Sequence, residues 1–264
     1  MSKILFRLTA ASALVILTSA LAFAQDFQKK YEIGAGGHIN VSSVSGNVTV
    51  TGYDGSVVLV TAIKEGSDRD KVEVEDTSAG DRIDLRTRYA PNCNCNASIN
   101  FTVQVPRSVK YNFDKLSTAS GNIEVRNVMG QLRARSASGD VTVEDVSGSI
   151  NASSASGNVR VKDASGAVNA SAASGNVEVE MTSVEGSENM EFTSASGNVY
   201  VKAPASLDAT VDMSSVNGSL KTDFPLEVKE PQYGSRRSAH GRLGNGSRSL
   251  KIRSASGDVS LTRM

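Results

Sequence analysis

Seven glycines, each nine residues after the last, constrain the fold of this chain more than any other feature; they run from Gly121 to Gly175. The residues two and four positions after each glycine are apolar, and the positions between them are polar almost throughout. This alternation is typical of a strand with one buried face. Ser-Gly or Ser-Gly-Asn before each strand favours a turn, because glycine can adopt positive φ. Each nine-residue unit therefore predicts one short strand and one corner.

Alternate units differ, so the true repeat is 18 residues: Ser-Ala-Ser-Gly recurs at Gly139 and Gly157, whereas the units between carry Asp-Val-Ser-Gly at Gly148 and Asp-Ala-Ser-Gly at Gly166. A strand and a corner cannot bury a face alone and must stack on their neighbours. We therefore expect an all-β fold, a single-stranded parallel β-solenoid (β-helix) with two-sided coils of about 18–22 residues and two sheets ~10 Å apart. On this interpretation the 38 Ser and 23 Gly mark corners rather than a flexible linker.

A charge pattern supports this register. Arg126, Glu144, Lys162 and Glu180 fall at outward positions 18 residues apart, so their charges would alternate up one sheet. The left-handed hexapeptide helix is excluded because it needs an apolar residue every six positions. The calcium-binding nonapeptide is excluded because each unit has one glycine and no regular aspartate. We expect no metal and no other cofactor.

The two ends depart from the regular repeat. Upstream, Gly46 and Gly55 are again nine residues apart, and longer strands follow them, so we expect residues 25–116 to form a wider N-terminal β region that caps the stack. Residues 117–264 are expected to form the solenoid repeat domain. Its later glycine intervals are 22, 21 and 39 residues, and the last of these predicts an insertion loop at residues 225–249.

The first 24 residues predict a cleaved signal peptide. Two basic residues precede an apolar run at residues 8–21, and Ala-Phe-Ala at 22–24 is a cleavage signature that leaves Gln25 as the mature start. The apolar run is short of the ~20 residues that span a bilayer. No similar run follows, so we expect no transmembrane segment in the mature chain. The predicted location is the periplasm, the cell surface or the extracellular space.

Cys93 and Cys95 are the two cysteines of the chain. Export favours a disulfide, although a one-residue spacer makes a strained ring. A structural zinc site requires four ligands, and the two histidines, His38 and His240, are distant from these cysteines in sequence. We expect a tight loop here, bridged or free, rather than a metal site.

No catalytic constellation stands out. Lys plus Arg balances Asp plus Glu at 28 each, which argues against a nucleic-acid partner. No G-x-S-x-G motif accompanies the serines. Glu178 and Glu180 lie two residues apart on an exposed strand face, as a pair of catalytic carboxylates would, but the charge ladder accounts for them. No Trp is present to stack on sugar rings. We therefore expect no enzymatic activity.

The sharpest feature outside the repeat is a basic cluster in the predicted insertion. Its candidate function is to bind an envelope component, whether polysaccharide, lipid headgroup or protein; a solvated loop is the alternative. The candidate partner-binding residues are Arg236, Arg237, His240, Arg242 and Arg248.

Several motifs together resemble the bacterial putative-adhesin family of β-strand-repeat domains of unknown function. They are Gly-Tyr-Asp-Gly at 52–55, Val-Pro at 105–106, His-Gly-Arg-Leu-Gly-Asn-Gly at 240–246, and the closing strand motif at 250–259. The resemblance implies a β-solenoid of the envelope or surface and carries over no catalytic residue. We expect a non-enzymatic, adhesin-like binding or scaffold module. The alternatives are a polysaccharide-active β-helix enzyme and an envelope-stress regulatory protein.

Overall fold

The computed structural model describes residues 26–184, 186–229 and 236–264; the predicted signal peptide lies outside them. The described residues form strands, with one 3-10 turn, η1 (Arg69–Lys71), and no α-helix. The strands are β1 (Phe27–Tyr31), β2 (His38–Ser45), β3 (Val48–Tyr53), β4 (Val58–Glu65), β5 (Val72–Asp76), β6 (Arg82–Tyr89), β7 (Ser98–Pro106), β8 (Lys110–Ser120), β9 (Ile123–Ser138), β10 (Val141–Ser147), β11 (Ile150–Ser156), β12 (Val159–Ser165), β13 (Val168–Ala172), β14 (Val177–Ser183), β15 (Met190–Ser196), β16 (Val199–Ala203), β17 (Ala209–Ser215), β18 (Leu220–Thr222), β19 (Glu227–Lys229), β20 (Arg237–Leu243), β21 (Ser249–Ser256) and β22 (Val259–Arg263).

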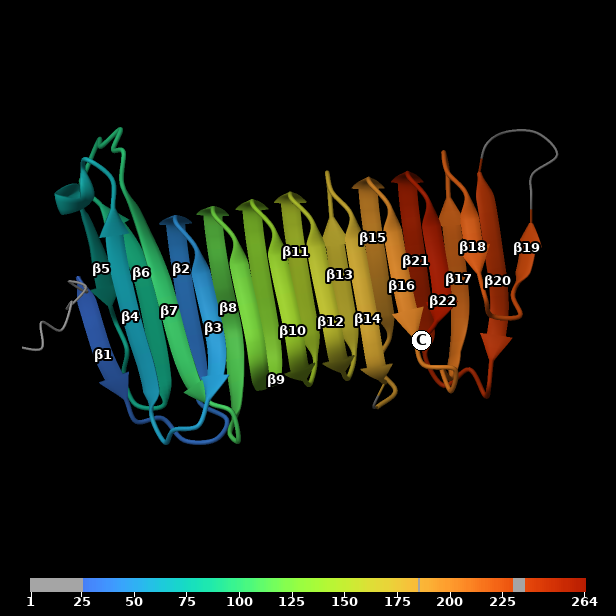
Figure 1. Cartoon of the computed structure of the whole chain (residues 1–264), viewed down its shortest axis with the longest axis horizontal. Helices are drawn as coiled ribbons and strands as arrows, with labels where there is room; N and C mark the ends of the chain where they lie inside the picture. The colour runs from blue at the N-terminus through green and yellow to red at the C-terminus, as the bar shows by residue number, and fades with distance from the viewer. Residues whose placement is uncertain (1–25, 185, 230–235) are drawn as a thin grey trace, which may run out of the picture.

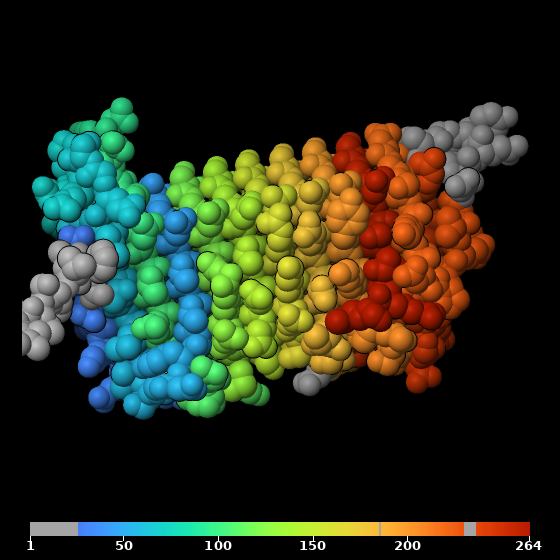
Figure 2. Space-filling model, in the orientation of Figure 1, coloured from blue at the N-terminus to red at the C-terminus, as the bar shows by residue number. Residues whose placement is uncertain are grey.

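The strands stack along the long axis of an elongated molecule, as Figures 1 and 2 show. They form two columns, which we call sheet one and sheet two. Sheet one runs β1-β4-β7-β3-β9-β10-β12-β14-β16-β22-β18. Sheet two runs β5-β6-β2-β8-β9-β11-β13-β15-β21-β17-β20-β19. Strand β9 belongs to both, with residues 123–129 in sheet one and 130–138 in sheet two. The predicted two-sided parallel solenoid is therefore confirmed.

The core lies between the two sheets and follows the predicted alternation. Val159 and Val161 are fully buried, and Arg160 between them faces outward. The residue seven positions after each of the first six of the seven glycines is also apolar, and it behaves differently in the two sheets. In sheet one, Asp145 adopts positive φ, so the strand resumes with Val146 buried. In sheet two the alternation is unbroken, so a serine turns inward and the following alanine is exposed at the corner.

The inward serine explains the Ser-Ala-Ser-Gly motif. The hydroxyl of Ser154 donates to the carbonyl oxygen of Gly139 on the coil before it, at 2.7 Å. Ser136 and Ser194 make the same bond to the preceding coils. The residue after each glycine adds a second ladder, in which the backbone N–H of Asn158 donates to the side chain of Asp140 at 2.8 Å. Polar groups buried at the corner are thereby satisfied.

Close stacking at this corner predicts a strict need for glycine. A Cβ atom at Gly157 would overlap the carbonyl oxygen of Gly139, whereas one at Gly34 meets nothing within 4 Å. We expect Gly157→Ala to lower the free energy of unfolding by about 3 kcal/mol, because backbone must shift through the stack. The matched Gly34→Ala change should stay within about 0.5 kcal/mol. Chemical denaturation of both variants measures the difference, and similar losses would contradict the stacking.

The order of coils in space departs from the order in the chain. At the C-terminal end the last coil, β21–β22, lies between β15–β16 and β17–β18. At the N-terminal end β2–β3 lies between β6–β7 and β8–β9. Neither rearrangement follows from the spacing of the glycines.

The two ends of the stack are closed by antiparallel strands. At the N-terminal end β4 and β1 extend sheet one, and β5 extends sheet two. The boundary expected after residue 116 falls inside β8, and a single hydrophobic cluster runs across it. The insertion expected as a loop at 225–249 contains strands β19 and β20, which are antiparallel additions to sheet two. Basic residues and one glycine, Gly241, interrupt the apolar alternation of β20, so the strand is not evident from the sequence pattern.

Candidate functional site

The outer face of sheet one neutralises its own charges. The side chains of Arg126 and Glu144 lie 3.3 Å apart on neighbouring strands, and Lys162 is in register on the next strand. The ladder continues through Glu180, whose carboxylate is 3.5 Å from the Lys202 ammonium. The predicted alternation of charge is present, and its consequence is a face on which ion pairs occupy most of the charged groups.

The outer face of sheet two has a different character. Over the eleven strands from β6 to β19, one outward row contains four cations, seven hydroxyls and no carboxylate; we call this part the hydroxyl–cation row. In spatial order it comprises Arg86, Ser42, Ser117, Arg135, Ser153, Ser171, Thr193, Arg253, Ser214, Ser238 and Lys229. Beyond β6 the row continues on the terminal strand β5 with Glu75.

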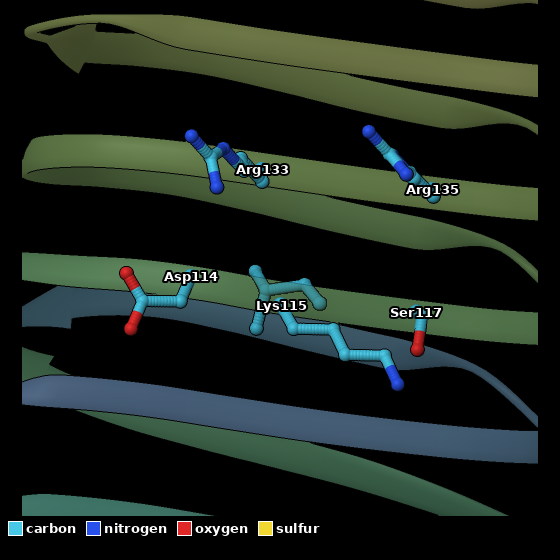
Figure 3. A pocket seen from close by; sticks show the side chains of 6 residues that line it. Asp114, Lys115, Ser117, Arg133 and Arg135 are labelled. Atoms are coloured by element: carbon cyan, nitrogen blue, oxygen red, sulfur yellow. The ribbon is translucent and has the colours of Figure 1, made fainter.

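A hollow of about 210 Å³ lies beside this row on β8 and β9. A bulge in β8 creates it: Phe113 and Leu116 both point inward, so Asp114 and Lys115 both lie outside. Figure 3 shows Asp114, Lys115 and Ser117 on one strand, with Arg133 and Arg135 on the strand beside it.

The charges around this hollow are unbalanced. Asp114 contacts His38 at 2.7 Å and Arg82 at 3.8 Å, so its charge is shared with side chains on β2 and β6. Within the described part of the chain, Lys115, Arg133 and Arg135 have no ion-pair partner. Three exposed cations thus line this hollow, and Asp114 is the carboxylate that lines it with them.

A second hollow lies further along the row, on β15, β21 and β17. It is lined by Thr193, Ser214, Arg236 and Arg253 together with small side chains of the corner. The carboxylate of Glu191 lies 3.9 Å from Arg253, at the limit of an ion pair.

The five basic residues predicted as a binding cluster make different contacts, and two of them, His240 and Arg242, occupy outward positions of β20. Arg236 lines the second hollow. His240 contacts Asp212 at 2.8 Å, and the remaining three arginines donate to backbone carbonyl oxygens. These are Arg237 to Gly218 at 2.7 Å, Arg242 to Asn245 at 2.8 Å, and Arg248 to Val184 at 3.1 Å.

The sequence analysis missed Arg133 and Arg135. A signal for them exists in the repeat itself. Arg-Ala-Arg at 133–135 occupies the positions that hold Asn-Ala-Ser at 151–153 and again at 169–171. Comparing the outward residues of sheet two between coils, as was done for sheet one, would have found this substitution.

Two carboxylates near the C-terminal end accept hydrogen bonds from backbone N–H groups. Hydrogen bonds from the backbone N–H and the hydroxyl of Ser219 lower the pKa of Asp258 below its usual range. Desolvation alone would raise the pKa of Asp208, but hydrogen bonds from the backbone of Ser247 and Gly246 outweigh it, and the pKa falls. Both side chains are therefore ionised at neutral pH and serve the fold.

The described residues contain no cluster of three or more His, Cys, Asp or Glu side chains that could hold a metal ion. Cys93 and Cys95 are paired as a disulfide, with Cα atoms 5.1 Å apart. No helix in the described part of the chain is long and apolar enough to cross a membrane.

The fold and its two contrasting faces define a two-sided parallel β-solenoid with one self-neutralised surface and one cationic, hydroxyl-rich surface. The profile of the Toastrack DUF4097 family matches residues 28–262, and the chain belongs to that family.

The solved structures that match the chain are distant in sequence. A putative adhesin from Bacteroides fragilis is 15% identical, with a TM-score of 0.41, and the match covers 90% of this chain and 96% of that one. A putative cell adhesion protein from Clostridium sporogenes is 10% identical, with a TM-score of 0.32 and coverage of 90% and 99%. A putative lipid binding protein from Parabacteroides distasonis is 14% identical, with a TM-score of 0.33 and coverage of 90% and 96%. No curated protein matches the chain.

Proposed function

We propose that this chain is exported and acts as a non-enzymatic, adhesin-like binding or scaffold module of the cell envelope. The predicted signal peptide at residues 1–24 supports export, with Gln25 as the first residue of the mature chain. The observation that carries the binding role is on the outer face of sheet two, where Lys115, Arg133 and Arg135 are exposed on a rigid sheet and have no ion-pair partner among the described residues.

A rigid sheet is a suitable platform for binding. Its side chains are held at fixed spacing by the strands beneath them, so little ordering entropy is lost when a ligand binds. The carboxylates that a polysaccharide-cleaving enzyme would use are engaged elsewhere. Glu178 lies 3.3 Å from Arg160, and Glu180 lies 3.5 Å from Lys202. These ion pairs favour the binding role over hydrolysis.

One experiment separates the proposal from the enzymatic alternative. The mature chain is incubated with the envelope fraction of the producing cell, and both sedimentation with that fraction and release of new reducing ends are measured. We expect the chain to sediment with the envelope and the reducing ends to stay at background. Release of reducing ends that is lost in Glu178→Gln or Glu180→Gln would overturn the proposal, as would absence of any sedimentation.

A further inference from the structure

We infer that the outer face of sheet two binds a linear acidic polysaccharide laid along the long axis of the solenoid. The inference rests on the proposed binding function and names its surface and its ligand class. The surface comprises a cationic end at Lys115, Arg133 and Arg135, an uncharged floor on β11 and β13, and a second end at Arg253. Strand β15 lies between the floor and Arg253, and its exposed Glu191 is 3.9 Å from that arginine.

The floor between the two cationic ends is formed by short, polar side chains. The outward residues of β11 are Asn151 and Ser153, and those of β13 are Asn169 and Ser171. Amides and hydroxyls both donate and accept hydrogen bonds, which matches the hydroxyl groups of a sugar chain. Neither β11 nor β13 has a charged side chain at these outward positions.

The spacing of the cations determines which acidic groups of a polymer can pair with both ends of the surface. Arg135 and Arg253 occupy the same row, and β11, β13 and β15 lie between them. Four strand spacings of ~4.8 Å separate the two guanidinium groups by ~19 Å along the axis. A polysaccharide can place acidic groups at that distance and hydroxyls between them. Its carboxylates would accept charge-assisted hydrogen bonds from the two arginines.

The same face is a poor match for other partners. Its floor carries no aromatic residue on which nucleic-acid bases could stack, and no large apolar anchor of the kind that dominates protein interfaces. A flat bilayer resting on the long arginine side chains would stand clear of the short serines between them. A flexible polymer can reach that floor.

The test measures binding of the mature chain to polygalacturonate, with its fully methyl-esterified form as the neutral control. We expect binding to the acidic polymer that weakens with rising salt, and no binding to the ester. The variant Arg133→Asn/Arg135→Ser copies the outward residues of β11 onto β9, so the coil should fold normally. Its affinity for polygalacturonate should fall about ten-fold or more, the equivalent of one lost charged contact.

A matched variant controls for net charge. Arg126→Ser/Lys202→Ser also removes two cations, but from the ladder on sheet one, and should change the affinity by no more than about two-fold. A second sheet-two variant, Ser171→Glu, leaves every cation in place and sets a carboxylate on the floor, so it should also weaken binding by about ten-fold or more. Circular dichroism and thermal melting confirm that all three variants are folded.

Each remaining outcome overturns the inference. Equal losses in the sheet-one and sheet-two variants would show that the chain responds to net charge alone. Binding to vesicles containing phosphatidylglycerol, but not to polygalacturonate, would replace the polysaccharide with a membrane. Failure of the mature chain to bind polygalacturonate while it still sediments with the envelope would reject this ligand class and leave the proposed function standing.

Discussion

Removing the last sixteen residues, 249–264, should unfold far more than those residues. They form β21 and β22, which are the neighbours in space of β15–β16 on one side and β17–β18 on the other. Their inward residues Leu250, Ile252, Val259 and Leu261 are buried almost completely. Burial of each such side chain contributes roughly 1.5–3 kcal/mol, so the loss is comparable with the whole stability of a typical domain.

Limited proteolysis of the shortened chain measures this effect. We expect a resistant fragment that ends near Ala203, the last residue of β16, because β17 to β20 lose the coil on which they stack. A chain that ends at residue 203 by design is the matched control, and it should yield the same resistant fragment. If the coils were stacked in chain order, the shortened protein would instead remain resistant through β18.

Replacing Val159 by Asp should be the most damaging single change in the regular repeat. Val159 is fully buried and stacks between Val141 and Val177, which are also fully buried. A carboxylate placed there meets no hydrogen-bond donor in a dry, apolar interior. We expect the free energy of unfolding to fall by about 4 kcal/mol or more.

The adjacent outward residue is the control for this change. Arg160 contacts Glu178 at 3.3 Å and Asp140 at 3.5 Å on the surface. Surface ion pairs contribute about 1 kcal/mol or less, so Arg160→Ser should cost much less than Val159→Asp. Urea denaturation of the two mature variants gives the comparison. Equal losses would mean that the inward and outward faces of β12 have been exchanged.

The regular repeat could be predicted from the sequence because its physics is local. A glycine with two apolar residues at fixed spacing specifies a corner and a half-buried strand without information from elsewhere in the chain. The inward positions of Val141, Val143, Val159 and Val161 follow from this pattern alone. The charge ladder that begins at Arg126 could be predicted from the sequence for the same reason.

The order of the coils depends on which corner stacks on which, and that choice is not local. The corners ending at Gly197 and Gly257 have nearly the same sequence, so either could follow the corner at Gly175. One signal was present: the corner at Gly218 replaces the usual Ala-Ser by Val216 and Asn217. Terminal repeats are commonly atypical, and this corner is the last of the parallel stack.

The candidate binding surface was missed because its residues come from coils that are distant in sequence. Arg253 belongs to the last coil of the chain, but its neighbour in the row is Thr193, which lies 60 residues earlier. A cluster in sequence, such as that at residues 236–248, attracts attention for its composition. In the structure, three arginines of that cluster donate hydrogen bonds to backbone carbonyl oxygens.

Arginine modification by phenylglyoxal, read out by mass spectrometry, tests most directly whether sheet two is the binding face. The unaltered mature chain is modified with and without polygalacturonate, so no substitution can disturb the fold. Protection by the polymer should concentrate on Arg133, Arg135 and Arg253, while Arg126 and Arg160 on sheet one react equally in both samples. Protection of the sheet-one arginines to the same extent, or protection of neither set, would contradict the assignment of sheet two as the binding face.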